Sequence, residues 1–131
     1  MEHNLKGRNI LIADDDTRNT YALICYLDAM GFGMNIHTAG SGGEALDLLR
    51  RHTNIELILM DMMMPGMDGF EAIRHIRDDQ ATREIPIIAV TARAMKGDRE
   101  KCLEAGASGY VSKPLDMELL LQKMSSLLNL S

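Results

Sequence analysis

The segment LILMDMMMPGMDG, residues 57–69, places one carboxylate, Asp61, directly after an apolar run and just before a turn that contains Pro65 and Gly66. A short run of Leu, Ile and Met is typical of a strand that is buried on both faces. A charge is costly inside such a strand, so we expect Asp61 at the point where the strand leaves the core. The stretch therefore predicts a buried strand and marks Asp61 as a candidate functional residue.

Strand-like and helix-like segments alternate along the whole chain. Strands are predicted at 9–13, 34–38, 55–60, 85–90 and 109–112, and helices at 17–30, after Ser41, after Asp68, from Met95 and from Asp116. Ser41 with Glu44, and Asp68 with Glu71, have the spacing of an N-terminal capping box. Regular alternation predicts an α/β fold, in which parallel strands are joined by right-handed helical crossovers on both faces of one sheet.

Length and charge limit the possible functions. The chain has 131 residues, 46% of them apolar and 25% charged, which predicts one globular domain over 1–131 with its core at about 8–129. A net charge of -5 provides no basic field for nucleic acid or an anionic membrane. The chain contains no apolar window of about 18 residues, so we expect no membrane span and a cytoplasmic protein.

Neither cysteines nor histidines form a metal or redox pattern. Cys25 and Cys102 lack CxxC spacing and are expected to be small core or boundary residues. His37, His52 and His75 fall on different predicted elements, and no pair has metal-binding spacing. A zinc site is therefore not expected.

Polar residues follow four of the predicted strands. Asp14, Asp15 and Asp16 follow the first, Asp61 the third, Thr91 the fourth and Lys113 the fifth. In open α/β sheets ligands bind beyond the carboxyl ends of the strands, so we expect these groups to converge. Asp16 is interpreted as the cap of the first helix rather than a metal ligand.

Converging carboxylates require a cation. Two of them 4 Å apart repel by about 1 kcal/mol in water and by about 4 kcal/mol at an intermediate dielectric. Oxygen ligands suit Mg²⁺ or Mn²⁺ better than zinc. Lys113, the Thr91 hydroxyl and the backbone N–H of Ala92 would then be available to phosphate oxygens. The pattern predicts a phosphoryl-transfer site.

Four segments, taken together, resemble the receiver domain of two-component response regulators: ILIADDDTRN (10–19), LILMDMMMPGMDGFE (57–71), VTA (90–92) and SKP (112–114). They occur in the family's order and at its usual intervals, and the resemblance covers nearly the whole chain. It implies a flavodoxin-like, doubly wound sheet of five parallel strands in the order 2-1-3-4-5 with five helices. It also implies a signalling domain rather than an enzyme, one that assists only its own phosphorylation and dephosphorylation.

The resemblance assigns a role to each residue of the site. Asp61 would accept a phosphoryl group from a phosphohistidine on a histidine kinase or a histidine phosphotransfer protein. Asp15 and Asp61 would ligate Mg²⁺ through their side chains, Asp14 mostly through water, and Met63 through its main-chain oxygen. Lys113 would contact both Asp61 and the phosphoryl group, and Lys113-Pro114 would be a cis peptide.

Signalling would follow from two further positions. The phosphate would draw the Thr91 hydroxyl inward, and Tyr110 would move into the vacated space. That movement would change the surface made by the fourth helix, the fifth strand and the fifth helix, which would bind an effector or a second copy of the chain. Met63 and Arg93, two residues after Asp61 and Thr91, are hypothesised to tune the lifetime of the phosphate.

Three alternatives remain open. An aspartate-nucleophile phosphatase would also form a phosphoaspartate, but it needs a second aspartate where this chain has Met63. A degenerate receiver would bind partners without being phosphorylated. The segment LKGRNILIADDDTRNTYAL (5–23) also resembles the terminal receiver of a hybrid histidine kinase.

Overall fold

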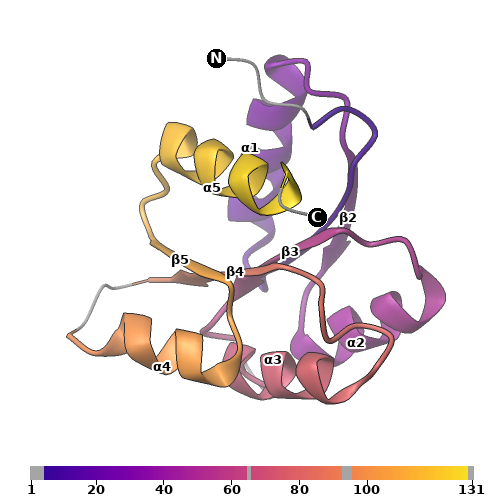
Figure 1. Ribbon diagram of the computed structural model, residues 1–131. Coiled ribbons are helices and arrows are strands. Elements are labelled where there is room, and N and C mark those ends of the chain that lie inside the picture. Colours follow the sequence, from indigo (N-terminus) through magenta and orange to yellow (C-terminus); the bar gives the residue numbers. More distant parts are fainter. Residues whose placement is uncertain (1–4, 65, 93–95, 130–131) are drawn as a thin grey trace.

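The computed structural model describes residues 5–64, 66–92 and 96–129, and it shows a parallel sheet covered by helices on both faces (Figure 1). The elements in chain order are β1 (Asn9–Ala13), α1 (Thr17–Ala29), β2 (Asn35–Ala39), α2 (Gly42–Arg51), β3 (Leu57–Asp61), α3 (Gly69–Asp78), β4 (Ile87–Thr91), α4 (Asp98–Ala105), β5 (Gly109–Ser112) and α5 (Met117–Asn129). The predicted α/β class is confirmed.

The five strands lie in the order β2-β1-β3-β4-β5, and every neighbouring pair is parallel. This is the predicted order. Strands β1 and β5 have the predicted bounds, and the other three are displaced by one or two residues toward the C-terminus. As a result Asp61 and Thr91 are the last residues of β3 and β4. Strand order reverses between β1 and β3, so their carboxyl ends form the topological switch point.

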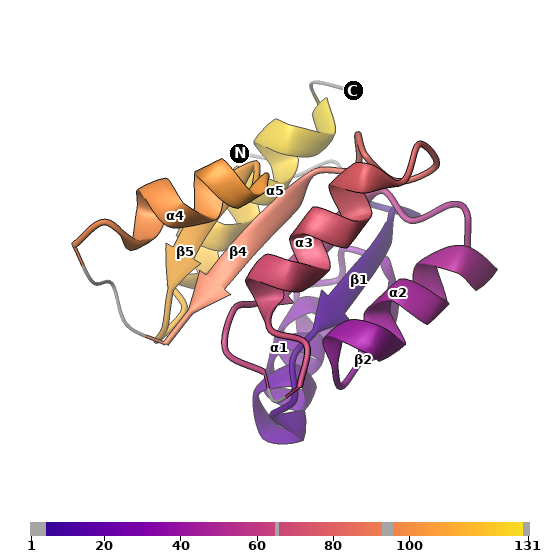
Figure 2. The same cartoon turned by 90° about the horizontal axis from the view of Figure 1, so that it is seen from below.

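Side chains alternate between two cores, one on each face of the sheet. Leu11, Ile58 and Met60 pack under α2, α3 and α4, whereas Ile10, Leu57 and Leu59 pack under α1 and α5. Figure 2 shows α2, α3 and α4 together on one side of the strands. Each fully buried Leu or Ile side chain stabilises the folded state by about 1.5–3 kcal/mol relative to an exposed one. Burial on both faces therefore stabilises β3, a short strand in which only the last residue, Asp61, is polar.

Side-chain caps fix the starts of α1, α2 and α3. The Asp16 carboxylate accepts hydrogen bonds from the backbone N–H groups of Arg18 and Asn19, at 3.0 and 3.4 Å. Ser41 and Asp68 cap α2 and α3 in the same way, at 3.1 and 3.0 Å. These caps were predicted and are confirmed. The predicted start of the fourth helix, Met95, lies outside the described residues; α4 begins at Asp98, after Gly97 with φ 88°.

Gly69 lets α3 begin directly against the end of β3. A Cβ atom added at this position would lie 2.6 Å from the Cα of Met62 and 2.8 Å from the carbonyl oxygen of Asp61. Both neighbours are backbone atoms, which cannot move aside cheaply. A Cβ added at Gly43, in the first turn of α2, would meet nothing within 4 Å. The glycine at 69 is therefore required by close approach, and the one at 43 is not.

Arg77 joins three segments at the edge of the sheet remote from Asp61. Its guanidinium donates to the carbonyl oxygens of Gly106, Arg83 and Ile85, at 2.9, 2.9 and 2.7 Å, and to the Ser108 hydroxyl at 3.3 Å. Burial lowers the pKa of the Arg77 guanidinium. The residue holds the C-terminal ends of α3 and α4 against the start of β4, a role that its position in the sequence did not indicate.

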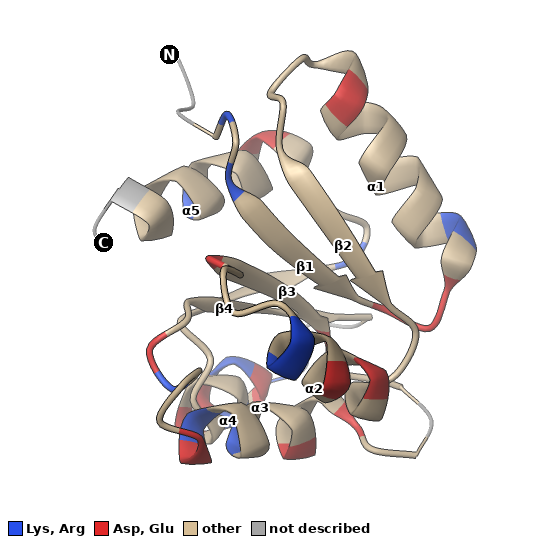
Figure 3. Cartoon of the chain, turned by 90° about the vertical axis from the view of Figure 1, so that its right-hand side faces the viewer, with Lys and Arg blue, Asp and Glu red and all other residues tan. Residues whose placement is uncertain are grey.

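The structure adds a contact between two histidines, and it corrects the prediction for one of the two cysteines. The rings of His37 and His52 lie with their centroids 4.7 Å apart, because α2 runs back along β2 and brings its C-terminal end beside the strand. His37 and His52 belong to different elements, β2 and the C-terminal end of α2, as the sequence predicted. Cys102 is buried as predicted, but Cys25 is exposed on the outer face of α1. Helix α1 has no charged residue between Arg18 and Asp28, whereas α2, α3 and α4 carry several (Figure 3).

Candidate functional site

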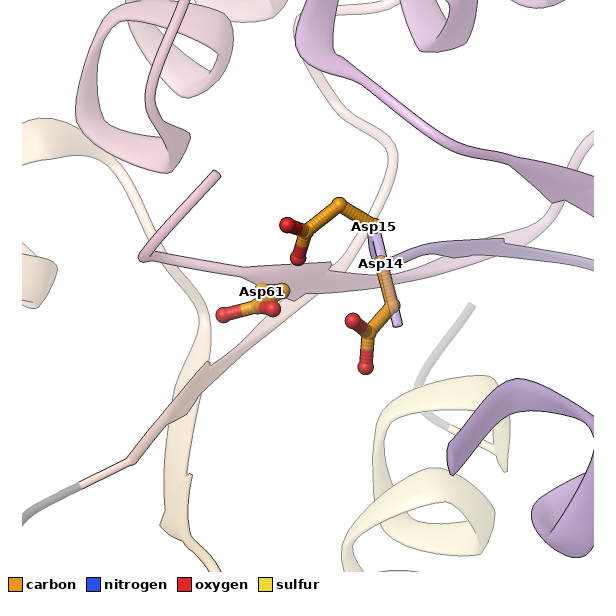
Figure 4. Close-up of side chains that lie close together, drawn as sticks. All are labelled: Asp14, Asp15 and Asp61. Carbon is orange, nitrogen blue, oxygen red and sulfur yellow. The ribbon is translucent and has the colours of Figure 1, made fainter. Parts of the chain in front are cut away.

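Three carboxylates converge at the switch point of the sheet. Asp14 and Asp15 follow β1, and Asp61 ends β3, the neighbouring strand. One oxygen from each lies within 4.8 Å of the others (Figure 4). The sequence predicted this convergence from the strand ends alone, and the parallel pairing of β1 with β3 is what produces it.

Asp61 is the most deeply placed of the three, with only 4% of its surface exposed. Burial raises the pKa of its carboxyl from 3.8 to about 6, because the charged form loses its hydration. A hydrogen bond from the backbone N–H of Met63 to Oδ1, at 3.0 Å, lowers the pKa, Asp14 raises it, and Lys113 lowers it. At neutral pH the carboxylate is mostly ionised, although its charge remains costly.

Lys113 reaches the cluster from the end of β5. Its Nζ lies 3.4 Å from Oδ2 of Asp14 and 3.6 Å from Oδ2 of Asp61. The Lys113-Pro114 peptide bond is cis, as the resemblance implied. The backbone N–H of Lys113 donates a hydrogen bond to the carbonyl oxygen of Thr91 at 2.7 Å, which holds the C-terminal ends of β4 and β5 together. One ammonium group thus pairs with two of the three carboxylates, those of Asp14 and Asp61.

Asp16 does not join the cluster, since its carboxylate caps α1. Its backbone N–H instead donates to Oδ1 of Asp14, at 2.8 Å, and so orients that carboxylate. The sequence predicted that Asp16 caps the first helix and, unlike Asp14 and Asp15, is not a metal ligand. The capping contacts of Asp16 agree with this prediction. The orienting hydrogen bond itself was not predicted, because it depends on the path of the loop.

The other predicted site residues surround the carboxylates. Thr91 is buried at the end of β4, and Ala92 follows it on the surface. Met63 is 68% exposed, whereas Met62 and Met64 on either side of it are buried. Tyr110 is half-buried on β5, next to the core under α4. Arg93, the second proposed tuning residue, lies outside the described residues.

The cluster is chemically suited to a hard divalent cation. Its described ligand groups are carboxylate oxygens, and no imidazole or thiolate is among them. Three carboxylates and one ammonium group leave an excess of two negative charges when all are ionised, which a divalent ion would neutralise. The residues present therefore fit Mg²⁺ or Mn²⁺.

Comparison with known proteins agrees with this geometry. The family model of the response regulator receiver domain matches residues 10–125. The chain belongs to this family. The polar-differentiation response regulator DivK of Brucella ovis is 39% identical over 121 residues, which cover 92% of this chain and 96% of DivK. The response regulator PleD of Caulobacter vibrioides is 41% identical over 118 residues, which cover 90% of this chain but 25% of PleD.

Solved receiver structures have the same fold. The receiver domain of the Francisella response regulator 1452 superposes with a TM-score of 0.83 at 25% identity, covering 94% of this chain and 98% of that one. The chemotaxis protein CheY4 of Vibrio cholerae gives 0.83 at 26% identity, covering 92% and 98%. The predicted receiver resemblance and the flavodoxin-like fold are thus confirmed.

Family membership establishes the general role. This chain is a receiver domain of the response-regulator type, which is a signalling domain of two-component systems, and such domains interact with histidine kinases or phosphotransfer proteins. Receiver domains generally bind Mg²⁺ at an acidic pocket, and the cluster of Asp14, Asp15 and Asp61 could bind a metal. Among the described helices, none has the length and apolar character needed to cross a membrane.

Proposed function

We propose that Asp61 is the phosphoacceptor of a two-component phosphorelay and that it takes its phosphoryl group from a phosphohistidine on a histidine kinase or a histidine phosphotransfer protein. The observation that carries the proposal is the position of Asp61, which lies beside the carboxylates of Asp14 and Asp15 with the Lys113 ammonium 3.6 Å from its Oδ2. The proposed functional unit is a single receiver domain over 1–131, with a core from about residue 8 to 129. We place its action in the cytoplasm, where ATP is available to charge a histidine kinase.

The charge arrangement supports this chemistry. Asp14, Asp15 and Asp61 would hold Mg²⁺, together with the main-chain oxygen of Met63. When bound, the ion supplies positive charge for the oxygens of the transferring phosphoryl group. Asp61 supplies the nucleophilic oxygen and must be ionised to do so, which its pKa of about 6 permits at neutral pH.

The remaining residues bind and orient the phosphoryl group. Lys113 acts as a point charge at the carboxylate. The hydroxyl of Thr91 and the backbone N–H of Ala92 donate hydrogen bonds to phosphoryl oxygens. No aspartate stands two residues after Asp61, where a phosphatase would need its general acid. For that reason the chain assists only its own phosphorylation and dephosphorylation.

The output surface consists of α4, β5 and α5. Among its described residues, α4 buries only Cys102, so this short helix is held weakly and can be repositioned at low cost. Thr91 and Tyr110 would couple the phosphate to this surface, Thr91 by moving toward the phosphate and Tyr110 by filling the vacated space. An effector or a second copy of the chain would bind the changed surface.

Mass spectrometry after incubation with acetyl phosphate and Mg²⁺ tests the assignment. One added phosphate, released by hydroxylamine as expected for an acyl phosphate, should be present in the wild type and absent from Asp61→Asn. The control is Asp47→Asn, since Asp47 is an exposed carboxylate on α2, and this variant should be phosphorylated normally. No phosphorylation of the wild type by acetyl phosphate or by any kinase would leave the degenerate receiver as the better account. Continuous release of phosphate from unrelated monoesters would favour the phosphatase.

Met63 is proposed to tune the lifetime of the phosphate, together with Arg93. The apolar side chain of Met63 is exposed beside Asp61 and can obstruct the water that hydrolyses the aspartyl phosphate. Met63→Asn should therefore dephosphorylate faster than the wild type, whereas Met30→Asn, at an exposed position after α1, should not. Equal rates for all three proteins would refute the tuning role of Met63.

A further inference from the structure

A cavity of about 350 Å³ extends from the carboxylate cluster between α1 and the segment that joins β5 to α5. Its floor is formed by Ile12, Leu59 and Val90, which come from three adjacent strands and face the same side of the sheet. Helices α1 and α5 lie on this side (Figure 1). The floor residues are each at least 94% buried, so they offer only a small apolar contact area at the base of the cavity.

The walls of the cavity are also mainly apolar. Leu23 contributes from α1, Leu115 from the segment after Pro114, and Met117 from the first residue of α5. A volume of this size lies at the lower end of the range for small-molecule sites, which are concave, mostly apolar and supplied with a few polar groups. The shape therefore suits an organic molecule of modest size.

The charged groups of the lining are concentrated at one end, and Asn19, Thr20 and Tyr26 add neutral polar groups along α1. Asp14, Asp61 and Lys113 line the cavity where it meets the metal site, and Asp15 lies just beyond. Counting Asp15, three carboxylates and a single ammonium group lie at this end and leave an excess of negative charge, so it attracts a cation and repels an anion. A ligand that matches the whole cavity has an apolar body and one cationic head.

We propose that this cavity binds small amphiphilic amines, with the ammonium group among the carboxylates of Asp14 and Asp61 and the apolar body on Ile12, Leu59 and Val90. The ammonium group would neutralise the same negative charge as a divalent ion. Amine and Mg²⁺ would then each weaken the binding of the other by the same factor. This antagonism and any effect on the phosphorylation of Asp61 rest on the proposed function, whereas occupancy of the cavity follows from its shape and charge.

Such a ligand would also affect the phosphoacceptor. Its body would lie against the aliphatic part of Lys113, which lines the cavity, and its head would compete with the ammonium group of that lysine for Asp14 and Asp61. An amine of this class is expected to slow phosphorylation of Asp61. The cavity would act as an inhibitory site beside the phosphoacceptor.

Methyl NMR spectroscopy of the unphosphorylated protein in EDTA tests the proposal, with 4-phenylbutylamine as the probe and 4-phenylbutanoate as its charge-reversed control. The amine should shift the methyl signals of Leu23, Val90 and Leu115 saturably and leave those of Leu103, exposed on α4, unchanged. It should bind at least about tenfold more tightly than the carboxylate. Addition of Mg²⁺ should raise the apparent Kd of the amine and reduce this preference.

Two variants should block the cavity. Leu23→Phe adds volume from α1, and Leu115→Phe does so from the opposite wall, which covers the case in which one of them fails to fold. Each should abolish binding of the amine while retaining a dispersed methyl spectrum. Leu119→Phe, at a position 43% exposed on α5 and outside the cavity lining, should bind the amine like the wild type.

Three results would overturn the proposal. These are absence of shifts at Leu23, Val90 and Leu115, equal affinity for the amine and the carboxylate, and binding that survives both cavity-filling variants, which would indicate ion pairing at the surface. The proposed function fails separately. A chain that binds the amine but is not phosphorylated on Asp61 refutes only the phosphoacceptor assignment, and a phosphorylated chain that does not bind it refutes only the cavity ligand.

Discussion

Replacement of Asp61 by asparagine should stabilise the metal-free protein. The carboxylate is 96% buried, and burial raises its pKa from 3.8 to about 6. At about 1.36 kcal/mol per pKa unit, the ionised form of Asp61 costs the folded state about 3 kcal/mol above pH 6. The amide introduced by Asp61→Asn carries no charge, and its oxygen can still accept the hydrogen bond from the Met63 N–H. The raised pKa already includes the attraction to Lys113, and the amide keeps the shape of the side chain, so we expect a net gain of about 1–3 kcal/mol.

The sign of the pH dependence follows from linkage. A raised carboxyl pKa means that the folded state binds more protons than the unfolded state between about pH 4 and 6. The contribution of Asp61 to stability therefore falls as the pH rises through this window and is constant above it. The difference in stability between the variant and the wild type should grow from near zero at pH 4 to its full value above pH 6.

Urea denaturation in EDTA at a series of pH values measures this difference. Mg²⁺ should reverse it, because an ion that binds only the folded state stabilises it by about 2.7 kcal/mol at a concentration 100 times its Kd. The wild type should gain this stabilisation and Asp61→Asn should gain less. Asp47→Asn, which removes an exposed carboxylate paired with Arg50, should change stability by less than about 0.5 kcal/mol. A variant that is less stable than the wild type in EDTA above pH 6, or a difference that does not vary with pH, would refute the reasoning.

Three further predictions concern the fold and are read by urea denaturation. Gly69→Ala should cost at least about 2 kcal/mol, because its Cβ would overlap the backbone at the end of β3, whereas Gly43→Ala should gain about 0.5 kcal/mol from helix propensity; equal effects would refute the close approach. Arg77→Met should cost about 2–4 kcal/mol, because partly buried carbonyl oxygens lose their donors, and the exposed Arg74→Met on the same helix should stay within about 0.5 kcal/mol; similar losses would show that the guanidinium contacts contribute little. Asp68→Ala should cost about 1 kcal/mol by removing the cap of α3, and Asp68→Asn should restore most of it, so failure of this rescue would contradict a capping role.

The local features were predictable because they depend on neighbours in the chain. A run such as residues 57–60 can be recognised as a buried strand from its side chains alone, and Ser41 and Asp68 can be recognised as caps because their partners are three residues away. The error of one or two residues in β2, β3 and β4 also has a local cause. Apolar residues such as Ile55 are buried before the strand begins, so hydrophobicity does not mark where backbone pairing starts.

The amino-acid sequence by itself determined the alternation of strands and helices, and it placed Asp14, Asp15, Asp61 and Lys113 at the ends of different strands. Only the tertiary structure decided which groups meet: the contact of His37 with His52, the burial that raises the pKa of Asp61, and the cavity between α1 and the start of α5. The physical reason is that desolvation and side-chain contact depend on strand register and loop path. Those are set by the packing of distant segments, which no short stretch of sequence encodes alone.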